Sequence, residues 1–328
     1  MRFDEIPRVK LAALPTPLEP MNNLSKRLGG PQLFIKRDDM TGLATGGNKT
    51  RILEFILGDA LSLEADIIVT GANPQSNFVR QTTAATRKLG LDLVLMISDE
   101  KPEEVNGNLL LTTIMGADIR FVGGHESDLG PKMEKVAQEL RESGRNPYVI
   151  HKFGSVPKGA VAYVNAFIEL ESQIEQQGLG VNKVVVSSAA GTYGGLCLGA
   201  LAADSDIEIT GIAISERSDN WEQNLSDLIN GTADYLGLEI EFGPDDINVN
   251  TDYFGEGYAV PTEGMVEAIK LVAQTEGVLL DPIYTGKGMA GLVDLIRKGV
   301  FTEEDEVVFW HTGGVPSLFT PQFRKLFT

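Results

Sequence analysis

Cysteine and histidine are scarce in this chain of 328 residues, which contains one cysteine, Cys197, and three scattered histidines, His125, His151 and His311. A single cysteine excludes a disulfide framework and a thiolate metal cluster, and it favours a reducing compartment. Three isolated histidines leave little material for a metal site. We therefore predict no bound metal, so any reactivity must come from other groups.

Long apolar runs and a net positive charge are also absent. No segment approaches the roughly eighteen apolar residues of a membrane span, and residues 1–7 lack the apolar core of a secretory signal. The formal net charge of −18, from 28 basic and 46 acidic residues, disfavours nucleic acids and anionic membrane surfaces as partners. We expect a cytoplasmic protein that binds neither nucleic acid nor membrane.

Short β-rich apolar runs alternate with helical patterns along the chain. The length suggests one large or two closely packed domains. The predicted strands are 33–36, 66–70, 91–97, 119–122, 148–151, 183–187, 209–214 and 307–310. The predicted helices are 49–63, 76–89, 103–116, 130–144, 158–177, 192–203, 218–236, 262–276 and 287–299. This alternation predicts an α/β fold with parallel sheets, whose ligands bind beyond the carboxyl ends of the strands.

The first candidate turn, Thr45–Arg51, contains Thr-Gly-Gly-Asn-Lys-Thr-Arg and looks like a phosphate loop. The phosphate-loop motif needs a lysine directly after its last glycine, but here Asn48 separates Gly47 from Lys49. The remaining functional interpretation is a lysine in the first turn of a helix, where desolvation and the positive helix end lower its pKa and favour Schiff-base chemistry. A surface lysine beside a capping asparagine is the ordinary alternative.

A second turn, residues 187–195, contains Ser-Ser-Ala-Ala-Gly-Thr-Tyr-Gly-Gly after an apolar strand. Small residues at a helix start let a phosphate approach the backbone N–H groups, and the helix dipole favours its charge. Thr192 adds a hydroxyl. A tight turn whose glycines serve only close packing explains the pattern equally well, and the dinucleotide motif G-x-G-x-x-G is absent.

Three further segments carry polar groups at similar turns. Residues 75–81, Gln-Ser-Asn-Phe-Val-Arg-Gln, open a predicted helix and suit a carboxylate, although Ser76 or Asn77 is equally well explained as a helix cap. Residues 280–288 contain Asp-Pro-Ile-Tyr-Thr-Gly-Lys-Gly, and residues 253–258 contain Tyr-Phe-Gly-Glu-Gly-Tyr. Each of these last two is by itself typical of ordinary loop packing.

Taken in order, these segments resemble the pyridoxal-phosphate (PLP) dependent family of D-cysteine desulfhydrase, L-cysteate sulfo-lyase and 1-aminocyclopropane-1-carboxylate (ACC) deaminase. The motifs that carry the resemblance are Gly-Gly-Asn-Lys-Thr-Arg, Gln-Ser-Asn, Ala-Gly-Thr, Gly-Tyr-x-x-Pro, Asp-Pro-x-Tyr and His-Thr-Gly-Gly. They run from Leu14 to Gly314, and segments 36–43 and 250–258 look most like the sulfo-lyase branch.

The resemblance implies a tryptophan-synthase-β-like fold, PLP fold type II, with two parallel-sheet α/β domains and the cofactor between them. The large domain would comprise residues 1–49 and 161–328, and the small inserted domain would comprise residues 50–160. The analogy also leads us to expect a homodimer.

The resemblance also implies roles for individual residues. The cofactor would be held by Lys49 as the Schiff-base lysine, Asn77 at the 3′-oxygen, Tyr284 against the pyridine ring, Thr285 at its nitrogen, and Ala189, Ala190, Gly191 and Thr192 at the phosphate. The catalytic residues would be Lys49, Ser76, Tyr258 and Tyr284. The substrate site would comprise Gln75, Ser76, Asn77, Phe78, Gly154, Tyr258 and Thr312.

The implied reaction is α,β-elimination on a small 2-amino acid resembling cysteate or D-cysteine, which gives a 2-oxo acid, ammonia and the leaving group. Lys49 would be the general base. Thr285 stands where the deaminase branch has glutamate, and a threonine leaves the pyridine nitrogen neutral, which favours prompt elimination over cyclopropane opening. ACC-type deamination or racemisation on the same fold, and a catalytically silent binding protein, are the alternatives.

Four departures from the family pattern bear on these expectations. Ile52 replaces a lysine near the phosphate, Phe78 replaces a histidine, Ala189 replaces a serine, and Lys-Phe-Gly-Ser-Val at 152–156 replaces Gly-Gly-Gly-Ser-Asn. Phe78 predicts a substrate that is larger or more apolar than cysteate. Because Ile52 removes a cation from an acidic chain, backbone N–H groups at helix starts must provide much of the phosphate binding.

Overall fold

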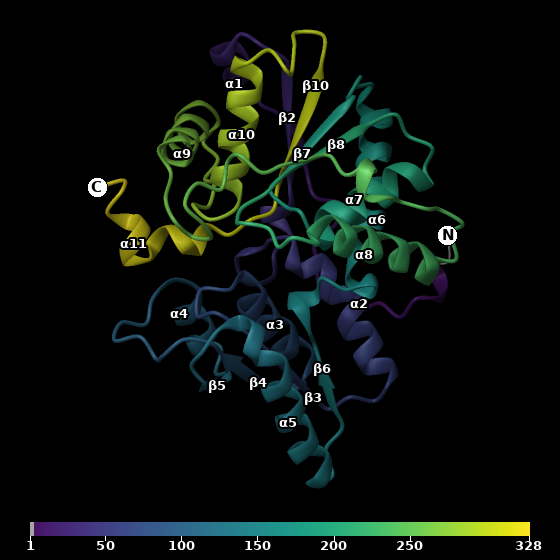
Figure 1. Cartoon of the computed structure of the whole chain (residues 1–328), viewed down its shortest axis with the longest axis vertical. Helices are drawn as coiled ribbons and strands as arrows, with labels where there is room; N and C mark the ends of the chain where they lie inside the picture. Colours follow the sequence, from purple (N-terminus) through teal and green to yellow (C-terminus); the bar gives the residue numbers. More distant parts are fainter. Residues whose placement is uncertain (1–2) are drawn as a thin grey trace.

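The computed structural model describes residues 3–328, which form two sheets (Figure 1). The larger sheet has the strand order β1-β2-β10-β7-β8-β9, formed by Leu18–Pro20, Gln32–Arg37, Glu306–His311, Lys183–Val186, Glu208–Ile212 and Val249–Asn250. The smaller sheet has the order β5-β4-β3-β6, formed by Asp118–Phe121, Asp92–Ile97, Ile67–Ala72 and Pro147–Val149. Within residues 3–328 every strand pair is parallel except β1 with β2.

Helices connect the strands and cover both sheets. They are α1 (Asn22–Leu28), α2 (Lys49–Ser62), α3 (Asn77–Leu89), α4 (Gly107–Ile114), α5 (Leu129–Glu142), α6 (Pro157–Gln177), α7 (Gly191–Ala202), α8 (Trp221–Leu236), α9 (Glu263–Glu276), α10 (Thr285–Arg297) and α11 (Pro321–Arg324). All the predicted strands and helices are present with slightly shifted ends, which confirms the α/β prediction. The short elements β1, β9, α1 and α11 were missed because each is too short to show a hydrophobic period.

The main apolar cluster includes residues of both sheets, and ten of the twelve residues of α7 are buried. Gly195 and Gly199 share one face of α7, and a Cβ on either would come within 2.5 Å of atoms in α6. Gly195 and Gly199 therefore allow α7 to pack closely against α6. From the sequence, close packing was one interpretation of the glycines in residues 187–195. Within residues 3–328 no helix is both long and apolar enough to cross a membrane.

The smaller sheet comes entirely from residues 67–149, a part of the segment 50–160 that was predicted as an inserted domain. However, α2 (Lys49–Ser62) crosses the predicted limit at 49/50 and is bonded to α6, because Arg51 Nη2 donates to Glu169 Oε1 at 2.8 Å. The domain limits at 49/50 and 160/161 therefore stay predictions, and residues 1–2 of the predicted large domain lie outside the described part.

Candidate active site

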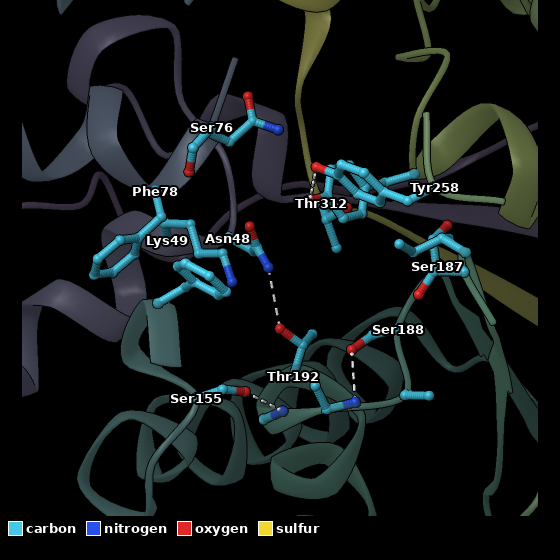
Figure 2. A pocket seen from close by; sticks show the side chains of 18 of the residues that line it. Asn48, Lys49, Ser76, Phe78, Ser155, Ser187, Ser188, Thr192, Tyr258 and Thr312 are labelled. Atoms are coloured by element: carbon cyan, nitrogen blue, oxygen red, sulfur yellow. Dashed lines mark hydrogen bonds between the residues drawn. The ribbon is translucent and has the colours of Figure 1, made fainter. Parts of the chain in front are cut away.

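A cavity of about 470 Å³ lies where the starts of α2, α3, α7 and α10 converge beyond the carboxyl ends of β7 and β10 (Figure 2). The structure brings most of the predicted site residues to its walls, namely Lys49, Ser76, Asn77, Phe78, Ala189, Ala190, Gly191, Thr192, Tyr258, Tyr284 and Thr312. Residues from distant parts of the sequence therefore meet at one place, as the motif order predicted.

Lys49 is the first residue of α2 and reaches into this cavity (Figure 2). Within residues 3–328 its amine has neither a hydrogen-bond acceptor nor a carboxylate partner. Desolvation lowers the pKa of Lys49 to about 8. An amine with this pKa is partly neutral at neutral pH, so Lys49 can act as a nucleophile or as a base.

A buried polar cluster fixes the start of α2 behind Lys49. Asp38 is fully buried and accepts hydrogen bonds from Arg51 Nη2 at 2.9 Å, Trp310 Nε1 at 2.9 Å and Tyr163 Oη at 2.7 Å. Burial alone would raise the pKa of Asp38, but the charge and hydrogen bonds of Arg51 hold it below its ordinary value. Because Arg51 lies two residues after Lys49, the cluster anchors the helix turn that presents the amine.

The glycine turn before α2 is sterically required. Gly46 has φ +70°, and a Cβ there would lie 1.8 Å from the carbonyl oxygen of Asp39. The turn places Asn48 within hydrogen-bond distance of two other segments. Its N–H donates to Thr312 O at 3.0 Å, and its Nδ2 donates to Thr192 Oγ1 at 3.0 Å. Asn48 thus ties the lysine-bearing turn to the start of α7.

The start of α7 can accept an anion. The N–H of Gly191 donates to Ser155 Oγ at 2.8 Å, but the N–H groups of Thr192 and Tyr193 have no acceptor within residues 3–328. Both donors lie at the positive end of the helix dipole, and Thr192 lines the cavity. Their arrangement favours the phosphate interpretation of residues 187–195.

Two cations besides Lys49 line the cavity. Arg217 follows β8, and its buried Nε has no partner. Desolvation lowers the pKa of Arg217. Lys152 lies at the exposed rim, and within residues 3–328 neither side chain pairs with a carboxylate. Ile52, by contrast, is buried in the core, so the two additional cations come from the loops that follow β6 and β8.

Asn77 begins α3, directly after the helix cap Ser76. Its Oδ1 accepts from Arg80 Nη1 at 2.8 Å and from Asn108 Nδ2 at 2.9 Å, so the amide orientation is fixed and Nδ2 is left as a free donor. Arg80 is fully buried, and desolvation lowers its pKa to about 10. Asn77 can therefore donate to an oxygen in the cavity.

Aromatic side chains form a wall beside Lys49. Phe78 is 1% exposed, and Phe153 belongs to the short 3₁₀ turn η5 (Lys152–Gly154). Lys152 and Phe153 adopt the left-handed conformation, with φ 48° and 54°, which side chains other than glycine rarely do. Gly154 does not line the cavity, but a Cβ there would lie 3.1 Å from the Phe78 ring, so it leaves room for the aromatic wall.

Tyr258 and Tyr284 form a hydroxyl pair on the opposite side. Their Oη atoms lie 2.8 Å apart, and their rings meet edge to face with centroids separated by 6.0 Å. Burial raises the pKa of both tyrosines, so both hydroxyls stay protonated. Lys287 holds the loop that carries Tyr258, because its Nζ donates to the carbonyl oxygens of Phe254 at 2.7 Å and Gly257 at 2.8 Å.

Gln75 and Thr285 are not in the cavity walls. The side chain of Gln75 turns toward the start of α4, where Oε1 accepts the N–H of Asn108 at 2.9 Å. Gln75 instead lines a neighbouring cavity of about 730 Å³. Thr285 is fully buried, and its hydroxyl donates to Asp281 Oδ1 at 2.7 Å. The proposed contacts of Gln75 with substrate and of Thr285 with cofactor have no support from these positions.

Several residues of the walls were not predicted, including Asn73, Glu126, Ser155, Ser187, Ser188 and Arg217. All three serines lie inside quoted segments, Ser155 in 152–156 and the other two in 187–195, and could have been found there. Glu126 follows β5 and accepts from the N–H and Nδ2 of Asn73 at 2.7 and 2.8 Å. Nothing in the sequence around Glu126 or Arg217 indicated a position near Lys49.

Comparisons with known proteins identify the family. Residues 9–313 match the family described as "Pyridoxal-phosphate dependent enzyme". The chain is 40% identical over 319 residues to D-cysteine desulfhydrase of Salmonella newport, and the match covers 95% of each chain. A crystal structure described as that of an ACC deaminase homologue superposes with a TM-score of 0.90 at 39% identity, covering 98% of this chain and 96% of that one.

A more distant solved structure shows the fold alone. Threonine deaminase isoform 2 from Solanum lycopersicum superposes with a TM-score of 0.66 at 15% identity, covering 92% of this chain and 80% of that one. These neighbours confirm the predicted PLP fold type II. The cavity residues fit the cofactor, because a free amine, open helix-start N–H groups and an unpartnered guanidinium face one space. The chain belongs to the family of pyridoxal-phosphate dependent enzymes, and pyridoxal 5′-phosphate is its cofactor.

Proposed function

We propose that this enzyme carries out α,β-elimination on a small 2-amino acid. With cysteine as substrate, cysteine and water would give pyruvate, ammonia and hydrogen sulfide. The observation that carries the proposal is the unpaired Lys49 amine, whose pKa burial lowers to about 8, in one cavity with the open start of α7. The names of the relatives, D-cysteine desulfhydrase and ACC deaminase homologue, support the reaction class.

Four groups would hold the cofactor. Lys49 would bind it covalently, the N–H groups of Thr192 and Tyr193 with Arg217 would bind its phosphate, and Asn77 Nδ2 would donate to its ring hydroxyl oxygen. When bound, PLP withdraws electrons from the substrate Cα and so makes the Cα proton acidic. Every other step depends on side chains of this chain.

Lys49 would act as the general base for the Cα proton. An effective base needs a pKa near the working pH, and the pKa of about 8 satisfies this condition. Because no carboxylate pairs with Lys49 within residues 3–328, nothing holds its amine in the charged form. The same amine can later return the proton or transfer it to solvent.

The start of α3 would bind the substrate carboxylate. The N–H groups of Asn77 and Phe78 have no acceptor within residues 3–328, and the Ser76 hydroxyl lies beside them in the cavity wall. This arrangement joins the positive end of a helix with a hydroxyl, which suits a carboxylate. Tyr258 and Tyr284, which stay protonated, would then supply a proton to the departing group.

The walls favour a thiol over a sulfonate as the leaving group. Phe78 and Phe153 give one side an apolar character, and Glu126 places a carboxylate near the tyrosine pair. A sulfonate would be repelled by Glu126 and poorly solvated by the phenyl rings. We therefore place D-cysteine-like substrates before cysteate. ACC-type deamination is the second candidate, because the solved structure described as an ACC deaminase homologue covers nearly the whole chain.

A substrate screen tests the proposal. PLP-loaded protein is incubated with D-cysteine, L-cysteine, L-cysteate and ACC, and 2-oxo acid, sulfide and sulfite are measured. We expect pyruvate and sulfide from cysteine, and no 2-oxo acid with Lys49→Ala. Release of 2-oxobutyrate from ACC alone would favour the second candidate. Protein that binds PLP but converts none of the four would contradict the proposal and favour a silent binding protein. The homodimer expected from the family resemblance stays a prediction, which light scattering can test.

A further inference from the structure

The second cavity, of about 730 Å³, adjoins the candidate active site. The two cavities share three wall residues, Asn73, Glu126 and Tyr258. Asn73 follows β3 and Glu126 follows β5, whereas Tyr258 lies in the loop before α9, so segments of both sheets meet at this junction. The side chain of cysteine is much smaller than the second cavity. The second cavity therefore offers room for a longer substrate side chain.

Glu126 holds an oriented carboxylate at the junction. Its Oε1 accepts from the N–H and Nδ2 of Asn73 at 2.7 and 2.8 Å, which fixes the direction of the side chain. Within residues 3–328 its Oε2 has no hydrogen-bond donor, and the carboxylate has no lysine or arginine partner. The residue is half-buried. A half-buried carboxylate with one free oxygen attracts a cation and repels an anion.

The charged groups on the walls of the two cavities have opposite signs. The cations on the walls of the first cavity are Lys49, Lys152 and Arg217. Among the described residues, Glu126 is the only carboxylate that lines this cavity. The carboxylates on the walls of the second cavity are Asp99, Glu104 and Glu126. No lysine or arginine of residues 3–328 lines the second cavity, and His125 there is cationic only when protonated, so a positive group is favoured beyond Glu126.

The proposed function decides which end of a 2-amino acid would meet Glu126. The amino group must lie at the cofactor, which Lys49 would bind, and Glu126 would repel the α-carboxylate. The side chain is then the end that remains for the junction. Tyr258, which Figure 2 shows across the cavity from Phe78, belongs to the same junction and to the tyrosine pair that would protonate the departing group.

We propose that Glu126 is a specificity-determining residue that selects substrates whose side chain ends in a cationic group, and that the second cavity receives this end. The inference rests on the proposed function and names its substrate class, cysteine derivatives with a cationic group on the sulfur substituent. With S-(2-aminoethyl)cysteine, Lys49 takes the Cα proton, the Cβ–S bond breaks with its electron pair on sulfur, and sulfur gains a proton. The substrate and one water give pyruvate, ammonia and 2-aminoethanethiol.

Three S-substituted cysteines of similar size test the inference, made from the cysteine enantiomer that the enzyme converts. They carry a cationic 2-aminoethyl, a neutral propyl or an anionic carboxymethyl group, and kcat/KM for 2-oxo acid release is measured on PLP-loaded protein. We expect the cationic compound to exceed the neutral one about 10-fold and the anionic one to be the poorest, because charge-assisted contacts are strong. Glu126→Gln, which keeps an oxygen for Asn73, should abolish this order, and Glu126→Asp should keep part of it.

A matched control and a binding measurement separate charge recognition from other effects. Glu103→Gln makes the same charge change at an exposed residue that lines neither cavity, and it should alter the cationic-to-neutral ratio less than about twofold. Lysine and 2-aminoheptanoate differ only in the cationic end and have no leaving group on Cβ. The absorbance change of the cofactor gives their dissociation constants. Lysine should bind about 10-fold more tightly to the wild type and no more tightly to Glu126→Gln.

Two results would overturn the inference. One is a cationic-to-neutral ratio that Glu126→Gln leaves unchanged, and the other is a wild type that converts cysteine but converts the three longer compounds equally or not at all. The wild-type comparison decides the matter even if Glu126→Gln does not fold. A wild type that releases 2-oxo acid from no cysteine compound contradicts the proposed function, whereas pyruvate from cysteine without a charge preference among the longer compounds contradicts only this inference.

Discussion

The starts of α7 and α10 face the same cavity, but one helix start is open and the other is filled. At α7 the N–H groups of Thr192 and Tyr193 have no acceptor within residues 3–328. At α10 the buried carboxylate of Asp281 accepts from the N–H groups of residues 283–285 and from the Thr285 hydroxyl. Of these two helix starts, only that of α7 can accept an anionic ligand, because Asp281 would repel an anion from α10.

The same contrast separates two lysines. Desolvation lowers the pKa of Lys49 and of Lys287 to about 8. Lys287 lies in the first turn of α10 and uses its hydrogens on two loop carbonyls, whereas Lys49 at the start of α2 has no partner within residues 3–328. The lowered pKa does not distinguish the two lysines. They differ because, within residues 3–328, only Lys287 has hydrogen-bond acceptors for its amine. Reactivity in this site follows from groups that the fold leaves unpaired.

The largest effect is expected for Asp281→Ala, which removes the carboxylate that fills the start of α10. It leaves three buried N–H groups and one hydroxyl without their acceptor, so the free energy of unfolding of the apoenzyme should fall by about 3 kcal/mol. Urea denaturation measures the change. The control is Asp246→Ala, which removes an exposed carboxylate that accepts one N–H group, from Gly243, and should lose less than about 1 kcal/mol. Equal losses in both variants would contradict the special role of the α10 start.

The pH dependence of covalent cofactor capture sharpens the lysine comparison. Only the neutral amine attacks an aldehyde, so the rate should rise about tenfold per pH unit below pH 8 and level off above it, given a pKa of about 8. Stopped-flow absorbance of apoenzyme mixed with PLP gives the profile. The same profile in Lys287→Met would assign it to Lys49. A rate that still rises steeply above pH 9 would mean that Lys49 has an ordinary pKa.

Arg217→Met tests whether the open helix start acts together with a cation. A hydrogen bond to a charged group is stronger than a neutral one, so the dissociation constant for PLP should rise about 10-fold or more. Pyridoxal, which lacks the phosphate, should bind both proteins equally well in the same fluorescence titration. Arg297→Met, which removes an exposed arginine paired with Glu267, is the control. Equal weakening for pyridoxal would place Arg217 away from the phosphate.

Lys152→Gly should have the smallest effect, and it is stabilising. Glycine relieves the left-handed backbone of Lys152 at φ 48°, so the free energy of unfolding should rise by about 0.5 kcal/mol after the extra freedom of the unfolded chain is subtracted. Glu64→Gly at φ 56° is a matched control outside the cavity. Thermal unfolding should show a similar gain for both variants. Destabilisation by Lys152→Gly alone would mean that the side chain makes contacts that hold the turn.

The sequence predicted the elements well but the site only partly. Strands and helices follow from hydrophobic periods, and the quoted motifs brought Lys49, Asn77 and Thr192 to one cavity as expected. The substrate contact of Gln75 stays a prediction, because adjacent residues at a helix start point in different directions and its side chain turns to α4. A motif therefore fixes where the backbone lies better than where each side chain points.

Arg217 and Glu126 could not have been predicted from local patterns. Each lies on a loop after a strand, far in sequence from Lys49, and neither sits in a segment with a recognisable motif. Their position follows from how two sheets pack, which depends on many weak contacts at once. Lys152 gave a partial signal, because a lysine where glycine is expected indicated a change at the site, but its left-handed backbone became visible only in the structure.

Covalent trapping of the cofactor tests the central claim, that the unpaired lysine of α2 is the reactive group. PLP-loaded protein is reduced with borohydride and digested, and the pyridoxyl-labelled peptide is identified by mass spectrometry. The account predicts a single label on Lys49, with none on Lys287, although desolvation lowers the pKa of both lysines to about 8. A label on Lys287 or another lysine, or no label at all, would contradict it.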